Sequence, residues 1–223
     1  MGFNPHPQIL RERDMSEKPM KIVIGIPIGK NHLIDMRTAA FCASVSRHPQ
    51  VSWCWAVSHY PEMGRNVLIE NHLKDNDMTH MMFVDSDTVP PDDALVKMLK
   101  IDKPFVSGVT PMFCGNELCW NIKRPDKPDT WWERDNPLPK EAFTTNHVGG
   151  SCLLIKREVF EKIGWPWFKT TFKPLGDDNI AKSVGEDVFL CDRAIESGYE
   201  VWVHPEVLCK HFNTIDLLTI QPI

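Results

Sequence analysis

The stretch THMMFVDSDTVPPDDAL, residues 79–95, places two carboxylates directly behind an apolar run. Residues 81–84 are all hydrophobic, which is typical of a strand buried on both faces of a sheet. Asp85 and Asp87 follow with only Ser86 between them. Carboxylates this close repel each other, and a divalent cation such as Mg²⁺ or Mn²⁺ relieves the repulsion. The stretch therefore predicts a metal site at the exit of a buried strand, with a cap on the following helix as the alternative.

Segments that favour strands alternate with segments that favour helices over the first 110 residues. The expected strands are 21–29, 51–59, 80–85 and 103–109, and the expected helices are 35–48, 62–77 and 90–102. This alternation predicts an α/β fold, a three-layer sandwich around a mainly parallel mixed sheet. Ligands bind such sheets beyond the carboxyl ends of the strands. Asp85 and Asp87 are expected at one of those ends.

The second half of the chain is less regular. Between residues 111 and about 147, proline, tryptophan and charged residues replace the alternating pattern. A strand and a helix are expected within 147–164, a helix over 185–198 and a strand over 199–212. The polar, proline-broken residues 1–19 predict a flexible leader, followed by a single domain at 20–223.

The composition narrows the class of protein. The 223 residues, 42% of them hydrophobic, suffice for a full core. A net charge of −5 argues against a protein that coats nucleic acid. The seven cysteines form no CxxC pair, which argues against a zinc site, and free thiols fit a reducing compartment. Because no apolar stretch approaches the roughly 20 residues of a membrane helix, we expect a cytoplasmic protein without a transmembrane segment.

Five segments, in this order, resemble the GT-A nucleotide-sugar glycosyltransferases of the family 2-like, D-x-D type. They are IVIGIPIG (22–29), GRNVLIENHL (64–73), MMFVDSDTVPP (81–91), VGGSCLLIKREVFEKIG (148–164) and GEDVFLCDRAIESGYEVWVHPEVLCKH (185–211). The resemblance covers roughly residues 21–212. It implies a GT-A fold in which residues 20–110 bind a nucleotide sugar, expected to be a UDP-sugar, and residues 111–223 bind the acceptor.

The resemblance also implies a metal site and a catalytic pair. Asp85, Asp87 and His211 would be ligands of Mn²⁺ or Mg²⁺, with Asp87 the more direct of the two aspartates. Asp187 would be the base that takes the proton from the acceptor hydroxyl, and Glu186 would orient the acceptor or stand in for Asp187. The alternatives from the residues alone are a surface histidine at 211 and a simple helix cap at 186–187.

The expected contacts to the nucleotide sugar come from four segments. The residues expected to make these contacts are Pro27, Gly29, Arg65, Asp85, Ser86, Gly149, Gly150 and Ser151. The guanidinium of Arg65 suits phosphate oxygens, with a surface salt bridge as the alternative. The pair Gly149–Gly150 would let the donor sugar approach the backbone closely, with a plain turn as the alternative.

Aromatic side chains gather in the middle of the chain. Trp131, Trp132, Trp165 and Trp167 are expected to stack on the acceptor, with a small satellite core as the alternative. Residues 121–175 also carry 10 basic against 7 acidic side chains. This local excess keeps a modified base of viral DNA open as an acceptor beside a glycan.

These features predict a metal-dependent glycosyltransferase that moves a sugar from a nucleotide-sugar donor to an acceptor hydroxyl with inversion, although retention stays open. A sugar nucleotidyltransferase would need a glycine-rich phosphate loop after the first strand, and GIPIGKNHL (25–33) matches that poorly. A non-catalytic carbohydrate-binding or regulatory relative would not need all three of the D-x-D pair, the GED segment and His211. The sequence gives no indication of the oligomeric state.

Overall fold

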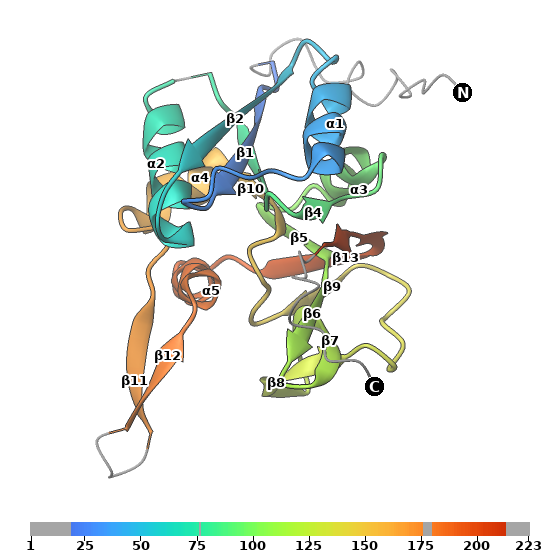
Figure 1. The fold of residues 1–223 in the computed structure, drawn as a ribbon, viewed down its shortest axis with the longest axis vertical. Helices are drawn as coiled ribbons and strands as arrows, with labels where there is room; N and C mark the ends of the chain where they lie inside the picture. The colour runs from blue at the N-terminus through green and yellow to red at the C-terminus, as the bar shows by residue number, and fades with distance from the viewer. Residues whose placement is uncertain (1–18, 76, 176–179, 213–223) are drawn as a thin grey trace.

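The computed structural model describes residues 19–75, 77–175 and 180–212 (Figure 1). The expected leader at residues 1–19 lies outside them except for its last residue. Within the described residues, no helix has the length and apolar character that crossing a membrane requires.

A seven-stranded sheet forms the centre of the molecule. Its order is β2 (Val51–Val57), β1 (Ile22–Ile28), β3 (His80–Val84), β10 (Cys152–Lys156), β5 (Phe105–Val109), β13 (Val201–Leu208) and β9 (Phe143–Thr145). The pairs β1–β2, β1–β3 and β5–β13 are parallel, whereas β10 and β9 run antiparallel to their neighbours. Five of the seven strands therefore point the same way, which confirms the α/β fold with a mainly parallel mixed sheet.

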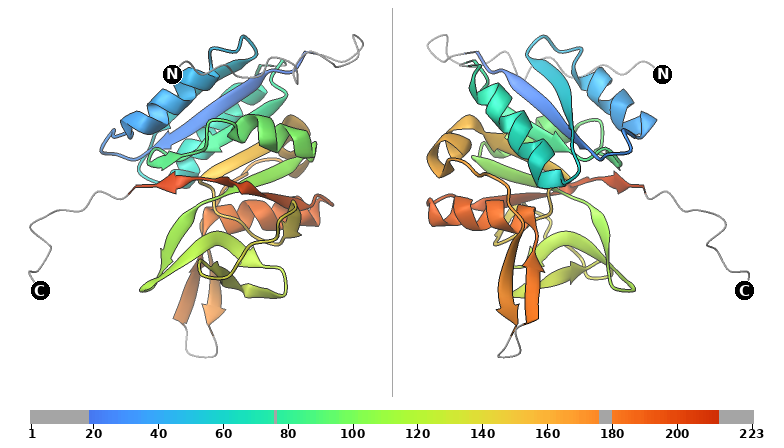
Figure 2. Two further views of the ribbon diagram at one scale, coloured as in Figure 1. Left: turned by 90° about the vertical axis from the view of Figure 1, so that its right-hand side faces the viewer. Right: turned by 60° about the vertical axis from the view of Figure 1, so that its left-hand side comes forward.

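Helices cover both faces of this sheet (Figure 2). One core contains side chains of α1 (Met36–Val45) and α3 (Ala94–Ile101). The other contains side chains of α2 (Pro61–Leu73), α4 (Arg157–Ile163) and α5 (Glu186–Glu196). Strand β1 serves both cores, because alternate side chains of a strand point to opposite faces. The result is the expected three-layer sandwich.

The helix expected at 90–102 begins later than predicted. Its first residue is Ala94 and its N-cap is Asp93, so the two prolines precede the helix instead of opening it. Thr88–Val89 forms a short strand, β4, which pairs with β14 (Lys210–His211). Capping of this helix by Asp87 or Thr88 is therefore wrong. Because Thr88 and Val89 pair with β14, they lie in a strand and cannot cap the helix.

A three-stranded sheet and a hairpin lie where the sequence predicted no strands. Strands β6 (Pro111–Cys114), β7 (Glu117–Arg124) and β8 (Lys127–Glu133) form an antiparallel sheet. Strands β11 (Thr171–Leu175) and β12 (Ile180–Val184) form a hairpin that extends from the body of the molecule (Figure 1). The register between β7 and β8 shifts twice, which breaks the simple alternation that marks a strand in a sequence.

Phe83 lies at the centre of the core beneath the D-x-D pair. Its ring meets those of Phe160 and Phe168 edge-on, with centroids 6.4 and 5.4 Å apart. We expect Phe83→Ala to lower the free energy of unfolding by about 3–5 kcal/mol, because the cavity cannot collapse in a packed sheet. Phe113→Ala, at an exposed position, should change it by less than about 0.5 kcal/mol. If chemical denaturation shows the same loss of stability for both variants, Phe83 does not lie at the centre of the core.

Candidate active site

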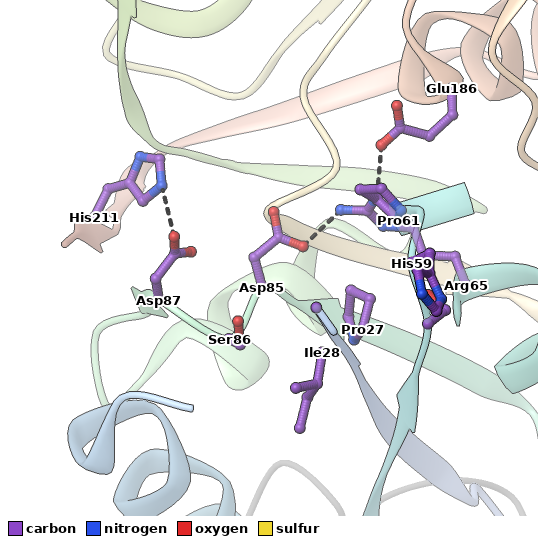
Figure 3. Close-up of a pocket in the computed structure, with 12 residues that line it drawn as sticks. Pro27, Ile28, His59, Pro61, Arg65, Asp85, Ser86, Asp87, Glu186 and His211 are labelled. Carbon is purple, nitrogen blue, oxygen red and sulfur yellow. Dashed lines mark hydrogen bonds and ion pairs between the residues drawn. The ribbon is translucent and has the colours of Figure 1, made fainter. Parts of the chain in front are cut away.

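A cavity of about 330 Å³ opens beyond the carboxyl ends of β1 and β3 (Figure 3). Its lining consists of Pro27, Ile28, Gly29, Ser58, His59, Pro61, Arg65, Asp85, Ser86, Asp87, Glu186 and His211. Eight of these were expected at the site from the sequence. Ile28, Ser58, His59 and Pro61 were not: Ile28 is the last residue of β1, and the segment between β2 and α2 brings the other three, which no motif marks.

The guanidinium of Arg65 holds two acidic segments together. Its side chain is 3% exposed, and its two terminal nitrogens donate to Asp85 Oδ1 and Glu186 Oε1, each over 2.6 Å. The group also lies 5.4 Å above the ring of Phe168. A surface salt bridge is therefore wrong for Arg65. Burial opposes its charge, but Asp85 and Glu186 outweigh burial and raise the pKa of Arg65.

The two glycines pack against different side chains, Gly150 against Arg65 and Gly149 against Asn121. A Cβ on Gly150 would lie 2.7 Å from Nη2 of Arg65, and a Cβ on Gly149 would lie 3.0 Å from Cβ of Asn121. The hydroxyl of Ser151 donates to Thr110 Oγ1 over 2.8 Å. None of the three lines the cavity. Gly150 therefore has a structural role, since it makes room for the buried guanidinium, and the expected contact of these residues with a donor sugar stays a prediction.

Gly150→Ala tests this packing. We expect it to lower the free energy of unfolding by about 1–3 kcal/mol, because the new methyl group overlaps a guanidinium fixed by two carboxylates. Gly29→Ala is the control, since its Cβ would come no closer than 3.4 Å to another atom. If both variants unfold at the same denaturant concentration as the parent chain, Arg65 is not confined as described.

Asp87 and His211 face each other at the opposite side of the cavity from Glu186 (Figure 3). Oδ2 of Asp87 lies 3.5 Å from Nε2 of His211, whose Nδ1 donates to the carbonyl oxygen of Pro111 over 2.8 Å. The pairing of β4 with β14 places His211 opposite Thr88 and so next to Asp87. The carboxylate of Asp87 is the main cause that raises the pKa of His211 to about 9.

The predicted set of three metal ligands is assembled only in part. Asp85 is turned toward Arg65, and the described residues contain no group of three side chains arranged to hold a metal ion. Asp87 and His211 fit a smaller role, because the carbonyl of Pro111 holds the ring with Nε2 toward Asp87. Ions such as Mg²⁺ are commonly held by one or two carboxylates together with substrate phosphates and water.

The start of α5 supplies two further carboxylates. Glu186 lines the cavity, whereas Asp187 does not, and Oδ1 of Asp187 accepts from the backbone N–H of Val188 over 2.7 Å. Burial is the main cause that raises the pKa of both carboxyl groups, and Arg65 opposes it. Carboxyl groups with raised pKa values are suited to exchange protons near neutral pH.

The four tryptophans expected at the acceptor lie away from this cavity. Trp167 is buried in the main core and its Nε1 donates to the carbonyl of Phe160, so its expected stacking on an acceptor is wrong. Trp132 packs on Phe143 and Trp131 lies under Lys123, as in a satellite cluster. Trp165 is 72% exposed.

A separate open groove of about 600 Å³ lies beside the small sheet. It is lined by Trp120, Arg134, Asn136, Pro137, Leu138, Pro139, Lys140, Pro205, Glu206 and Leu208. Trp120 pairs with Pro111, the residue that holds His211. The groove is therefore one strand pairing away from His211, and the sequence indicated it only through its local excess of basic and aromatic residues.

Comparison with known proteins supports the fold. No family model and no curated protein matches the chain. A197 from STIV superposes with a TM-score of 0.61 at 19% identity, over 87% of each chain. GalNAc-T7 with UDP, GalNAc and Mn²⁺ gives a TM-score of 0.53 at 12% identity. That match covers 88% of this chain and 44% of GalNAc-T7, so the chain spans less than half the length of that relative. With the sheet described above, these matches define a GT-A-like α/β fold.

Proposed function

We propose that this protein is a glycosyltransferase that moves a sugar from a nucleotide-sugar donor to an acceptor hydroxyl. One observation carries the proposal: a cavity at the carboxyl ends of β1 and β3 has the Asp87–His211 pair on one side and the acidic start of α5 on the other. Ligands of such sheets bind at these strand ends. The structure of GalNAc-T7, which holds UDP, GalNAc and Mn²⁺, supports a UDP-sugar as donor and a divalent ion as cofactor.

In this proposal the donor lies along the cavity. Its nucleoside rests against Pro27, Gly29 and the neighbouring Ser58–His59 segment, and its diphosphate faces Asp87 and His211. These two residues would hold Mn²⁺ or Mg²⁺, and the ion supplies charge neutralisation for the departing diphosphate. Asp85 is fixed by Arg65 and directs the sugar through its second oxygen, which Arg65 Nη2 does not contact.

Asp187 is the proposed base. Glu186 is occupied by its ion pair with Arg65, so it orients the reacting groups, whereas Oδ1 of Asp187 accepts from the backbone N–H of Val188. As the acceptor oxygen bonds to the sugar carbon, the carbon–oxygen bond to the diphosphate breaks and the acceptor proton passes to Asp187. One displacement of this kind inverts the sugar carbon.

In this proposal residues 20–110 bind the donor and residues 111–223 bind the acceptor. The groove at Trp120 offers a flat ring for a sugar or a base, and Arg134 and Lys140 add positive charge. A glycan and a modified base of viral DNA both fit this chemistry. The net charge of −5 favours the glycan.

Incubation with Mn²⁺ and a panel of nucleotide sugars tests the function directly. We expect release of nucleoside diphosphate from one donor, because water replaces the acceptor slowly in such a site. Absence of both release and donor binding across the panel would favour the non-catalytic relative. Formation of a nucleotide sugar from a sugar phosphate and a nucleoside triphosphate would favour the nucleotidyltransferase.

Asp87→Ala should abolish binding of the nucleoside diphosphate that depends on Mn²⁺. The carboxylate is the only acidic group that faces His211 among the described cavity residues, so its removal leaves one ligand for the ion. Calorimetric titration with and without Mn²⁺ measures the loss. Asp92→Ala, an exposed carboxylate five positions away, is the matched control and should bind as the parent chain does. Unchanged Mn²⁺-dependent binding by Asp87→Ala would exclude the metal role.

Asp187→Asn should keep donor binding but slow transfer by about 10²–10⁴-fold, the usual contribution of a general base. Because the pKa of Asp187 is raised, transfer by the parent enzyme should be full above that pKa and fall as the pH falls through it. The Asn variant should lose this step in the pH profile. Glu186→Gln is the comparison: if it alone removes the step, Glu186 is the base and the proposed roles are exchanged.

A further inference from the structure

The central sheet has an open edge at β2. This strand lies at the end of the strand order and pairs only with β1 among the described residues. Its sequence, VSWCWAV, contains no charged residue and no proline. Edge strands are usually protected by such residues, because their unpaired backbone groups are a template for another strand. The edge of β2 carries none of these protective features.

The backbone of β2 shows which groups face this edge. Ile22 N donates to Gln50 O over 2.8 Å, and Ser58 N donates to Ile28 O over 3.0 Å. Because backbone directions alternate along a strand, the even-numbered residues direct their N–H and C=O groups toward β1. The odd-numbered residues 53, 55 and 57 therefore direct theirs outward, whereas the N–H of Val51 already donates to His48 O over 3.0 Å.

Exposed apolar side chains gather beside the same edge. Trp55 is 58% exposed, and Val57, Tyr60, Met63 and Val67 are also exposed. Helix α2 packs close to β2, since a Cβ on Gly64 would lie 2.9 Å from Ser58 Oγ and 3.4 Å from Ala56 O (Figure 1). Val67 lies one turn after Gly64 on that helix, so both faces of the open edge present apolar surface.

We propose that a second copy of this chain pairs with β2, antiparallel and about a two-fold axis at Cys54. In this register Trp53 lies opposite the partner's Trp55, and Val51 lies opposite the partner's Val57. The Trp53–Trp55 pair can exchange both backbone hydrogen bonds, whereas in the Val51–Val57 pair Val51 offers only its carbonyl, because its N–H already donates to His48 O. Aromatic pairs opposite each other stabilise neighbouring strands.

The size of the surface agrees with a dimer. The five exposed side chains offer roughly 500 Å² per copy, so two copies would bury about 1,000 Å², the lower limit for a specific interface. The strands of the two copies run in opposite directions across the axis. The two cavities therefore lie at opposite ends of the joined sheet, and neither is closed by the pairing.

Sedimentation and light scattering of the full chain test the proposal. We expect twice the chain mass of 25.6 kDa. Trp55→Lys and, independently, Val67→Glu should shift the protein to the monomer with an unchanged circular dichroism spectrum. Trp165→Lys is the matched control, since it replaces an even more exposed tryptophan away from this edge, and should stay dimeric. A monomeric parent chain, or a dimer that survives both substitutions, would overturn the proposal.

A disulfide between the Cys54 residues of the two copies would test the proposed register of the β2 strands. Opposed residues of a non-hydrogen-bonded antiparallel pair have Cα atoms about 4.5 Å apart, within the range of a disulfide. Copper-catalysed air oxidation should therefore join two chains, removing one hydrogen from each thiol, and the product should be absent in Cys54→Ser. A cross-linked product that persists in Cys54→Ser would place the interface elsewhere and reject this pairing.

Discussion

The buried guanidinium of Arg65 is the interaction on which the site depends. It is one cation between Asp85 at the end of β3 and Glu186 at the start of α5. Removing one partner from a buried ion pair commonly costs about 3–5 kcal/mol, because the other charge stays behind without compensation. The ends of a strand, a helix and the Gly149–Gly150 turn are thus held together by one side chain, and the cavity forms around it.

This arrangement gives the two aspartates of the D-x-D pair different environments. Asp85 accepts from a fixed guanidinium, while Asp87 faces His211, which is itself held by the carbonyl of Pro111. Residue 86 separates them, so their side chains point to different neighbours. Local sequence cannot show this difference, since it arises from α2 on one side and from the β4–β14 pairing on the other.

The sequence predicted six of the seven central strands, because they are largely apolar runs, but it missed β9 in the irregular middle of the chain. It also predicted that Asp85, Asp87, Arg65, Glu186 and His211 would meet. It failed where a residue type has several uses. Gly150 admits Arg65, Trp167 fills the core, and the small sheet of β6–β8 hides behind two register shifts. Each depends on contacts between segments far apart in the chain.

The charge of the cavity explains why a cation belongs to the proposed chemistry. Asp85, Asp87 and Glu186 are carboxylates, and Arg65 already pairs with two of them. A donor diphosphate would bring further negative charge into the same 330 Å³, where the surrounding protein screens less than water does. As a proposed ligand of the ion His211 would be neutral, so it would add no positive charge of its own. Binding of a diphosphate and binding of a divalent ion are therefore mutually favourable here, since each compensates the repulsion that the other would leave.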